Sequence, residues 1–214
     1  MASKLTPLPP ERRLARLLDR SMSLGVDDTT KLADQVAFLA RVGRIKIQLD
    51  PAELNAAKVD KNTVLPLSLG ASLSFRAWLN LSLEPFGLTY VPYGDGLKVV
   101  CRTADNDGLA RPSERQKAEN ERVAKALATP VPFDFRGESL KKVVAYFEEK
   151  TQESFVLDPI ARHAGSVRPE MTVTGSSDKE PLASALKKLL APVGMTYVVR
   201  DEAVVLTRTP YPRR

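Results

Sequence analysis

The sequence contains few of the residues from which enzymes most often build reactive centres. It has one cysteine and one histidine among 214 residues, so neither an intramolecular disulfide nor a site with several thiolate or imidazole ligands can form. Cys101 stands in an apolar stretch and is expected to be a small buried residue, and His163 is expected to end a short helical turn. We therefore assign no catalytic, cofactor-binding or metal-binding residue and predict that the protein is not an enzyme.

Long apolar runs are also missing, so the sequence predicts no membrane-spanning helix, which needs about 20 apolar residues. The first ten residues, MASKLTPLPP, lack the apolar segment of a secretory signal. As written, the chain is therefore expected to stay in the cytosol. The net charge of +6 is spread along the chain and mixed with acidic residues, which favours a solvated surface over a nucleic-acid site.

The most informative pattern present is an internal repeat. Leu32–Pro51 aligns without a gap on Leu140–Pro159, and Pro85–Val91 aligns on Pro192–Val198. Most positions that agree are apolar or turn residues, which is typical of a repeated scaffold rather than a repeated active centre. The pattern indicates one supersecondary unit present twice.

The repeat predicts two domains, each of a size that can bury a modest core. Residues 1–103 form the first repeat with an N-terminal lead helix, and residues 112–214 form the second with its own lead helix and a short basic tail. Residues 104–111, polar and followed by a proline, are a linker. We expect two separable copies rather than one fused core.

The sequence pattern predicts the same order of elements after the lead helix of each copy. The order is strand, helix, strand, strand, helix and hairpin. Caps are expected at Thr29 or Thr30 and at Ser139, and the third strand of the first copy is expected at Leu65–Leu69. This is an α+β fold in which two helices pack on a small mixed sheet.

Three features that resemble functional motifs have simpler structural interpretations. Asp50 and Asp158 each precede a proline and are expected to cap the short helical turn that follows. Trp78 lies on an apolar helical stripe, where packing explains it better than ligand stacking. The adjacent carboxylates at 27–28 and 148–149 are expected to be solvated, because helical neighbours point about 100° apart.

Four segments carry a resemblance to a known family: the entry Val131–Leu140, the strand ending in Asp-Pro, the helix Ser74–Leu83, and the Gly-Leu/Met-Thr-Tyr-Val hairpin. In their order, twice over, they resemble the short N-terminal domain of secretins and TonB-dependent receptors (the STN-like domain), in the tandem form seen in planctomycete proteins. The similarity covers roughly residues 20–103 and 129–209.

This resemblance implies a periplasmic or cell-envelope module without catalysis that receives another protein. We expect the partner to add a strand at a sheet edge or in a groove between the domains. On the sequence as written we expect two departures from the family, the lack of a following β-barrel or secretin core and the lack of a preceding signal peptide. A nucleic-acid-binding, KH-like protein is the alternative, although the Gly-x-x-Gly clamp of that class is missing. An enzyme acting on a small ligand is the third hypothesis.

Overall fold

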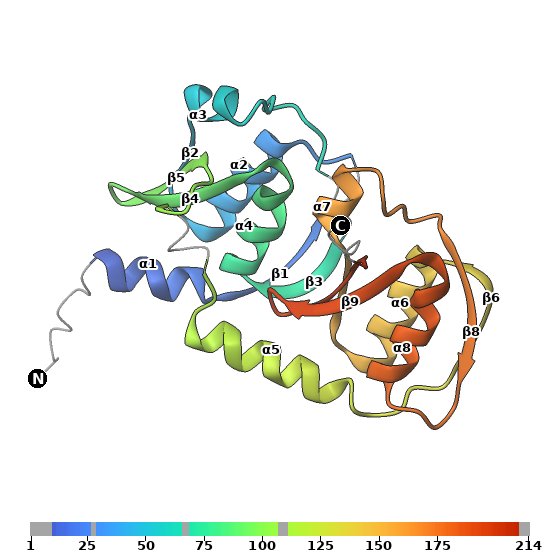
Figure 1. The fold of residues 1–214 in the computed structure, drawn as a ribbon. Coiled ribbons are helices and arrows are strands. Elements are labelled where there is room, and N and C mark those ends of the chain that lie inside the picture. Colours follow the sequence, from blue (N-terminus) through green and yellow to red (C-terminus); the bar gives the residue numbers. More distant parts are fainter. Residues whose placement is uncertain (1–9, 27–28, 66–68, 107–110, 210–214) are drawn as a thin grey trace, which may run out of the picture.

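The computed structural model describes residues 10–26, 29–65, 69–106 and 111–209 (Figure 1). It is an α+β fold of short helices and small sheets. The elements of the first half are α1 (Pro10–Leu18), β1 (Ser21–Val26), α2 (Leu32–Gly43), β2 (Ile47–Leu49), α3 (Pro51–Ala56), β3 (Leu69–Ser74), α4 (Phe75–Leu83), the 3₁₀ turn η1 (Glu84–Phe86), β4 (Leu88–Tyr93) and β5 (Gly96–Cys101).

The second half begins with a longer helix, which is drawn below the first half in Figure 1. Its elements are α5 (Glu114–Ala126), β6 (Phe133–Ser139), α6 (Leu140–Thr151), β7 (Ser154–Leu157), α7 (Pro159–His163), β8 (Thr172–Ser177), α8 (Leu182–Leu190), η2 (Ala191–Val193), β9 (Met195–Arg200) and β10 (Ala203–Arg208). The expected lead helices, short helical turns and hairpins are all present. Half of the predicted linker, residues 107–110, lies outside the described residues.

The strands of each half form two sheets instead of the single mixed sheet expected. β1 pairs antiparallel with β3, and β6 with β8, as separate two-stranded ribbons. The mixed sheets have the orders β2-β5-β4 and β7-β10-β9, each with one parallel and one antiparallel neighbour to its central strand. Because the entry strand of each half pairs with the third strand, only the remaining three strands are left to form the mixed sheet.

Two further expectations about the first half need correction. The structure describes β3 as Leu69–Ser74, so the third strand continues beyond the expected Leu65–Leu69, of which residues 66–68 lie outside the described residues. The residue that caps α2 is Lys31, whose side chain makes no capping bond, rather than Thr29 or Thr30. The expected cap at Ser139 is confirmed, since its hydroxyl accepts a bond from the Lys142 amide.

The mixed sheet of the second half is shared between two hydrophobic cores. Its strands alternate faces, so Phe155, Val204 and Leu206 pack in the core of the second half. Val156, Ala203 and Val205, each at most 1% exposed, pack instead in the core of the first half. A sheet that is apolar on both faces must be covered on both, so residues of the second half also take part in the first core. That the two copies are separable stays a prediction from the sequence.

Helix α4 lies at the centre of this arrangement, and all nine of its residues are buried. A helix enclosed on every side is apolar around most of its circumference. Trp78 is fully buried, and its indole nitrogen donates a 3.3 Å bond to the Met22 carbonyl oxygen. The structural interpretation of this tryptophan is confirmed.

Candidate functional site at the junction of the two halves

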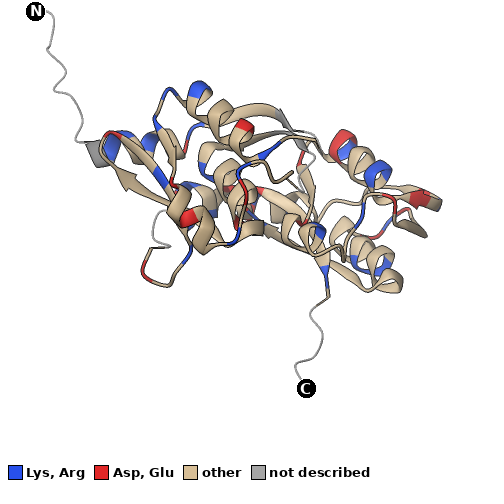
Figure 2. Cartoon of the chain, turned by 90° about the horizontal axis from the view of Figure 1, so that it is seen from above, with Lys and Arg blue, Asp and Glu red and all other residues tan. Residues whose placement is uncertain are grey.

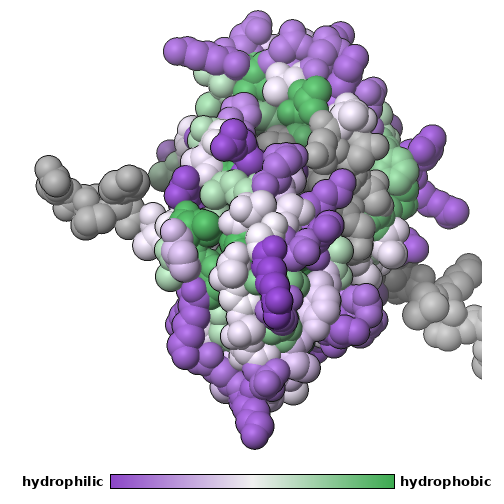
Figure 3. Space-filling view, turned by 90° about the vertical axis from the view of Figure 1, so that its right-hand side faces the viewer, coloured by the Kyte–Doolittle hydropathy of each residue, from purple (hydrophilic) through white to green (hydrophobic). Residues whose placement is uncertain are grey.

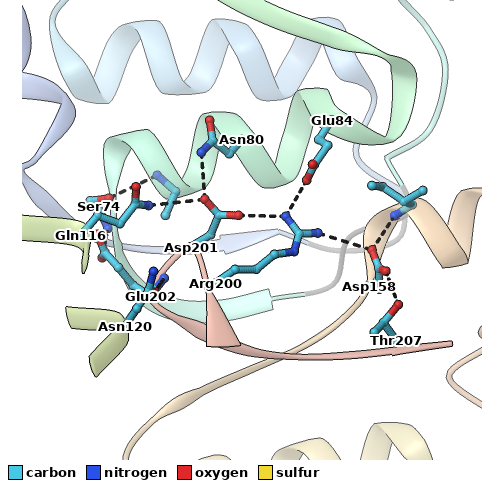
Figure 4. Close-up of polar contacts among 12 residues, drawn as sticks. Ser74, Asn80, Glu84, Gln116, Asn120, Asp158, Arg200, Asp201, Glu202 and Thr207 are labelled. Carbon is cyan, nitrogen blue, oxygen red and sulfur yellow. Dashed lines mark hydrogen bonds and ion pairs between the residues drawn. The ribbon is translucent and has the colours of Figure 1, made fainter. Parts of the chain in front are cut away.

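The tip of the β9–β10 hairpin enters the junction between the halves (Figure 4). Arg200 ends β9, and the two-residue turn Asp201-Glu202 leads directly into β10. Both turn residues have positive φ angles, of 50° and 62°, as the primed turns of two-residue hairpins require. Glycine or asparagine usually meets that requirement, so two acidic residues here indicate that their side chains stabilise the structure in other ways.

Asp201 is 7% exposed and lies against helices of both halves. Its carboxylate accepts bonds from the amide nitrogens of Asn80 on α4, at 2.8 Å, and of Gln116 on α5, at 3.4 Å. Burial raises the pKa of Asp201 above its ordinary value of 3.8, and the positive charge of Arg200 partly opposes that rise. The site therefore holds a carboxylate that is costly to bury but well supplied with hydrogen bonds.

Arg200 forms ion pairs with three carboxylates at this junction. Its guanidinium lies 2.9 Å from Asp201, 2.5 Å from Glu84 at the end of α4, and 3.5 Å from Asp158 at the start of α7. Asp158 also accepts bonds from the Thr207 hydroxyl, at 2.5 Å, and from the Ile160 amide. A planar guanidinium with several donors suits such a shared position better than an ammonium would.

Glu202 ties the hairpin tip to the start of α4. Its carboxylate accepts a 2.8 Å bond from the Ser74 amide nitrogen, and its own amide donates to the side chain of Asn120 on α5. A negative charge beside the first amides of a helix is favourable, because these amides lack intrahelical partners. The second oxygen of this carboxylate is buried without a bond among the described residues.

This junction network joins α4, α5, α7 and the hairpin tip, and its chemistry is that of a structural connection. Its members are Ser74, Asn80, Glu84, Gln116, Asn120, Asp158, Arg200, Asp201, Glu202 and Thr207. Sequence reasoning did not single out Asn80, Arg200, Asp201 or Glu202. A signal was available in the second hairpin turn, where Asp-Glu replaces the glycine-containing turn of the first.

The structure places the candidate residues of the sequence apart from one another. Asp50 caps α3 by accepting a bond from the Ala52 amide at 2.9 Å, and Asp158 caps α7 in the same way, as expected. His163 ends α7, with its ring edge-on to Phe86 at 5.0 Å between centroids. Cys101 ends β5 and is half-buried, with its amide bonded to Glu53.

The two paired-carboxylate motifs have different outcomes. Glu148 is partly buried, which raises its pKa, and it accepts a bond from the Phe155 amide. Glu149 is exposed and pairs with Lys150. The aspartates at 27–28 lie outside the described residues.

An apolar sheet edge lies close to the junction network. β9 is the terminal strand of the sheet β7-β10-β9, and Val198 at its centre is 42% exposed. Its neighbours Tyr197 and Val199 are half-buried. On the face drawn in Figure 3, by contrast, hydrophilic side chains predominate and apolar ones form small separate groups. An exposed apolar edge is unusual in a soluble protein, since it invites pairing with another strand.

No family model, no curated protein and no solved structure matches the chain. Among the residues that the structure describes, no group of three or more histidine, cysteine or carboxylate side chains is arranged to hold a metal ion. Within the same residues no helix has both the length and the apolar character needed to cross a bilayer.

Proposed function

We propose that this chain is a non-enzymatic protein–protein interaction module of the secretin/TonB N-terminal type, built from two copies of one α+β unit and associated with the cell envelope. Support for the duplication comes from the strand pairing. In each half the entry strand pairs with the third strand, and the hairpin pairs in parallel with the strand that ends in Asp-Pro.

Equivalent positions in the two halves differ, and these differences explain why only the second half presents an apolar sheet face to the other half. Val156 and Val205, which face the first core, correspond to Gln48 and Lys98 in the first half. Lys98 pairs with Asp50 at 2.7 Å, and Gln48 is exposed. Likewise α8 presents Lys187 and Lys188 to solvent where α4 is enclosed. Polar outer faces are how the terminal units of a repeat array avoid further stacking.

The observation that carries the interaction role is the open edge of β9. In a two-residue hairpin the residues that flank the turn form a hydrogen-bonded pair, here Arg200 with Ala203. Pairing alternates along the ladder, so the peptide groups of Val199 and Tyr197 point away from β10. A partner strand can bond to these groups while its side chains pack on Val198.

Photo-crosslinking in cells that express the chain tests this role. Val198 is replaced by p-benzoylphenylalanine, and the control carries the same group at Ile160, which is equally exposed at 43% but lies on α7. We expect a covalent adduct of one defined mass from position 198, formed in the envelope fraction, and none from position 160. Equal labelling from both positions, or none from 198, would remove the support for this edge.

The purified chain separates the other two functions. Binding of single-stranded oligonucleotides that weakens steeply with salt would favour the nucleic-acid alternative, because phosphate contacts release counterions. A catalytic turnover that one point mutation abolishes would overturn the non-enzymatic assignment. Neither result is expected for a module whose contacts are made through a strand edge.

A further inference from the structure

A second surface, distant in the fold from the β9 edge, has the features of a preformed docking site. A groove with a volume of about 330 Å³ lies between α1, the end of α2 and the tip of the β4–β5 hairpin. Leu14 and Leu17 from α1, with Ile45 and Pro92, supply apolar walls, and Arg13 and Arg44 line it as well. We refer to it as the α1 groove.

The walls of the α1 groove are held in place by backbone contacts. The Leu97 amide donates a 2.8 Å bond to the Lys46 carbonyl oxygen, which fixes the hairpin against the segment after α2. The approach is so close that a Cβ atom at Gly96 would lie 2.3 Å from that oxygen. Leu14 and Leu17 are anchored because they pack against the first core. A preformed apolar groove loses little entropy when an occupant binds.

The charge around the α1 groove is positive and unbalanced. Arg13 and Arg44 are exposed, and within the described residues neither guanidinium makes an ion pair or hydrogen bond. The acidic residue in the lining, Asp95, already pairs with Lys46 at 3.5 Å. Arg12 and Arg16, also on α1, are exposed and add to the basic residues at this end of the molecule (Figure 2). Two unpaired arginines beside an apolar wall match carboxylates next to an apolar side chain.

We propose that the α1 groove binds an acidic protein segment, with one bulky apolar side chain between Leu14, Leu17 and Ile45 and with flanking carboxylates on Arg13 and Arg44. This proposal rests on the protein-binding function proposed above but uses a different surface. Among the described residues that line the groove none is aromatic and able to stack a base, which disfavours single-stranded nucleic acid. A second copy of this chain is disfavoured because its own net charge is +6.

Fluorescence polarisation with the full chain tests the proposal. The probe is a fluorescein-labelled peptide, Gly-Glu-Glu-Asp-Leu-Phe-Asp-Glu-Glu-Gly, and the matched control peptide carries Gln and Asn in place of Glu and Asp. Arg44→Gln is a mild change because Gln152 occupies the equivalent left-handed position at the end of α6. We expect Arg13→Glu combined with Arg44→Gln to weaken binding of the acidic peptide by about tenfold. Arg168→Glu, an exposed charge reversal in the second half, leaves it unchanged.

Titration of the full chain with the same peptides, followed by NMR, distinguishes the acidic segment from the other possible occupants. Methyl resonances of Leu14, Leu17 and Ile45 shift with the acidic peptide if the proposal holds. It is overturned if Arg168→Glu weakens binding as much as the double variant does, if the neutral peptide binds equally well, or if only an oligonucleotide binds. Concentration-dependent dimerisation that the double variant abolishes would also overturn it. Crosslinks from position 198 report on β9 alone, so either surface can fail while the other stands.

Discussion

The Asn80 side chain on α4 donates a 2.8 Å hydrogen bond to the Asp201 carboxylate, which comes 121 positions later in the chain. The carbonyl oxygen of the same amide accepts a 3.3 Å bond from the Tyr90 hydroxyl. Asn80 therefore satisfies a buried carboxylate of the second half and a buried phenol of the first. Such a shared group makes the stability of each half depend on the other.

Removal of the Asn80 amide should be costly, because it leaves a buried charged acceptor with one bond fewer. We expect Asn80→Ala to lower the free energy of unfolding by about 2 kcal/mol, measured by urea denaturation. Asn62→Ala, at an exposed position, is the control and should change it by less than about 0.5 kcal/mol. Equal effects of the two variants would contradict the importance of the junction network.

Cleavage of the connection between the halves should not separate them. Val156, Ala203 and Val205 are buried in the core of the first half, so the two fragments retain a shared apolar interface after proteolysis within residues 104–111. We expect one peak of the uncut size on a native gel-filtration column and two half-size fragments only in denaturant. Two peaks under native conditions would show that the copies are separable.

The interface should also respond to a single side-chain truncation. Val205→Ala removes buried methyl groups where the sheet of the second half enters the first core, and we expect the free energy of unfolding to fall by about 1 to 3 kcal/mol. The control is Val198→Ala on the paired strand, where the side chain is 42% exposed. Calorimetry of Val205→Ala should show one transition shifted as a whole, and a shift confined to one of two transitions would contradict a common core.

A positive φ angle offers a way to stabilise the first half. Lys58, exposed just after α3, has a φ of 56°, whereas Gly165 has a φ of 69° at the matching position after α7. We expect Lys58→Gly to raise the free energy of unfolding by about 0.5 to 1 kcal/mol, because glycine adopts this conformation without strain. Gly165→Ala should lower it by a similar amount. Thermal denaturation of both variants checks the pair, and destabilisation by Lys58→Gly would contradict it.

The buried carboxylate of Asp201 predicts a definite pH dependence. Its raised pKa means that the folded state holds the proton more tightly than the unfolded chain, whose pKa is near 3.8. The stabilising contribution is therefore complete below 3.8 and is lost as pH rises through the higher folded-state value. Arg200, Glu84, Asn80 and Gln116 surround the group in the native and variant proteins alike.

Asp201→Asn removes this titration and keeps an acceptor for Asn80. Urea denaturation of both proteins between about pH 3 and about pH 7 gives the difference in their free energies of unfolding. We expect that difference to move in favour of the variant as pH rises above 3.8. A difference that moves in favour of the native protein would show that the ion pair with Arg200 outweighs the burial of the carboxylate.

Local elements could be predicted from the sequence because their stabilising contacts lie close together in the chain. The caps at Asp50 and Asp158 bond to amides two residues later, and Ser139 to an amide three residues later. The hairpins depend likewise on adjacent strands and short turns. These contacts need no partner from another part of the fold, so residue types and spacing are sufficient.

The candidate surfaces were harder to predict because their residues come from distant segments. The α1 groove combines α1, the end of α2 and a hairpin tip, and the junction network combines α4 with residues more than a hundred positions later. One signal was present, since Ala203–Leu206 is apolar without alternation whereas Lys98 interrupts the matching strand. An uninterrupted apolar strand indicates burial on both faces, but not what covers each face.

The sequence by itself determined the α+β class, the order of the elements and the helical turns after Asp-Pro, since apolar periodicity and capping act over a few residues. Only the tertiary structure decided that each half splits its strands between two sheets and that one mixed sheet serves two cores. It also decided that Asp201 and Glu202 are buried between the halves, with Arg200 half-buried beside them. Those outcomes depend on which apolar faces meet. That choice minimises exposed apolar area over the whole chain, and no local pattern specifies it.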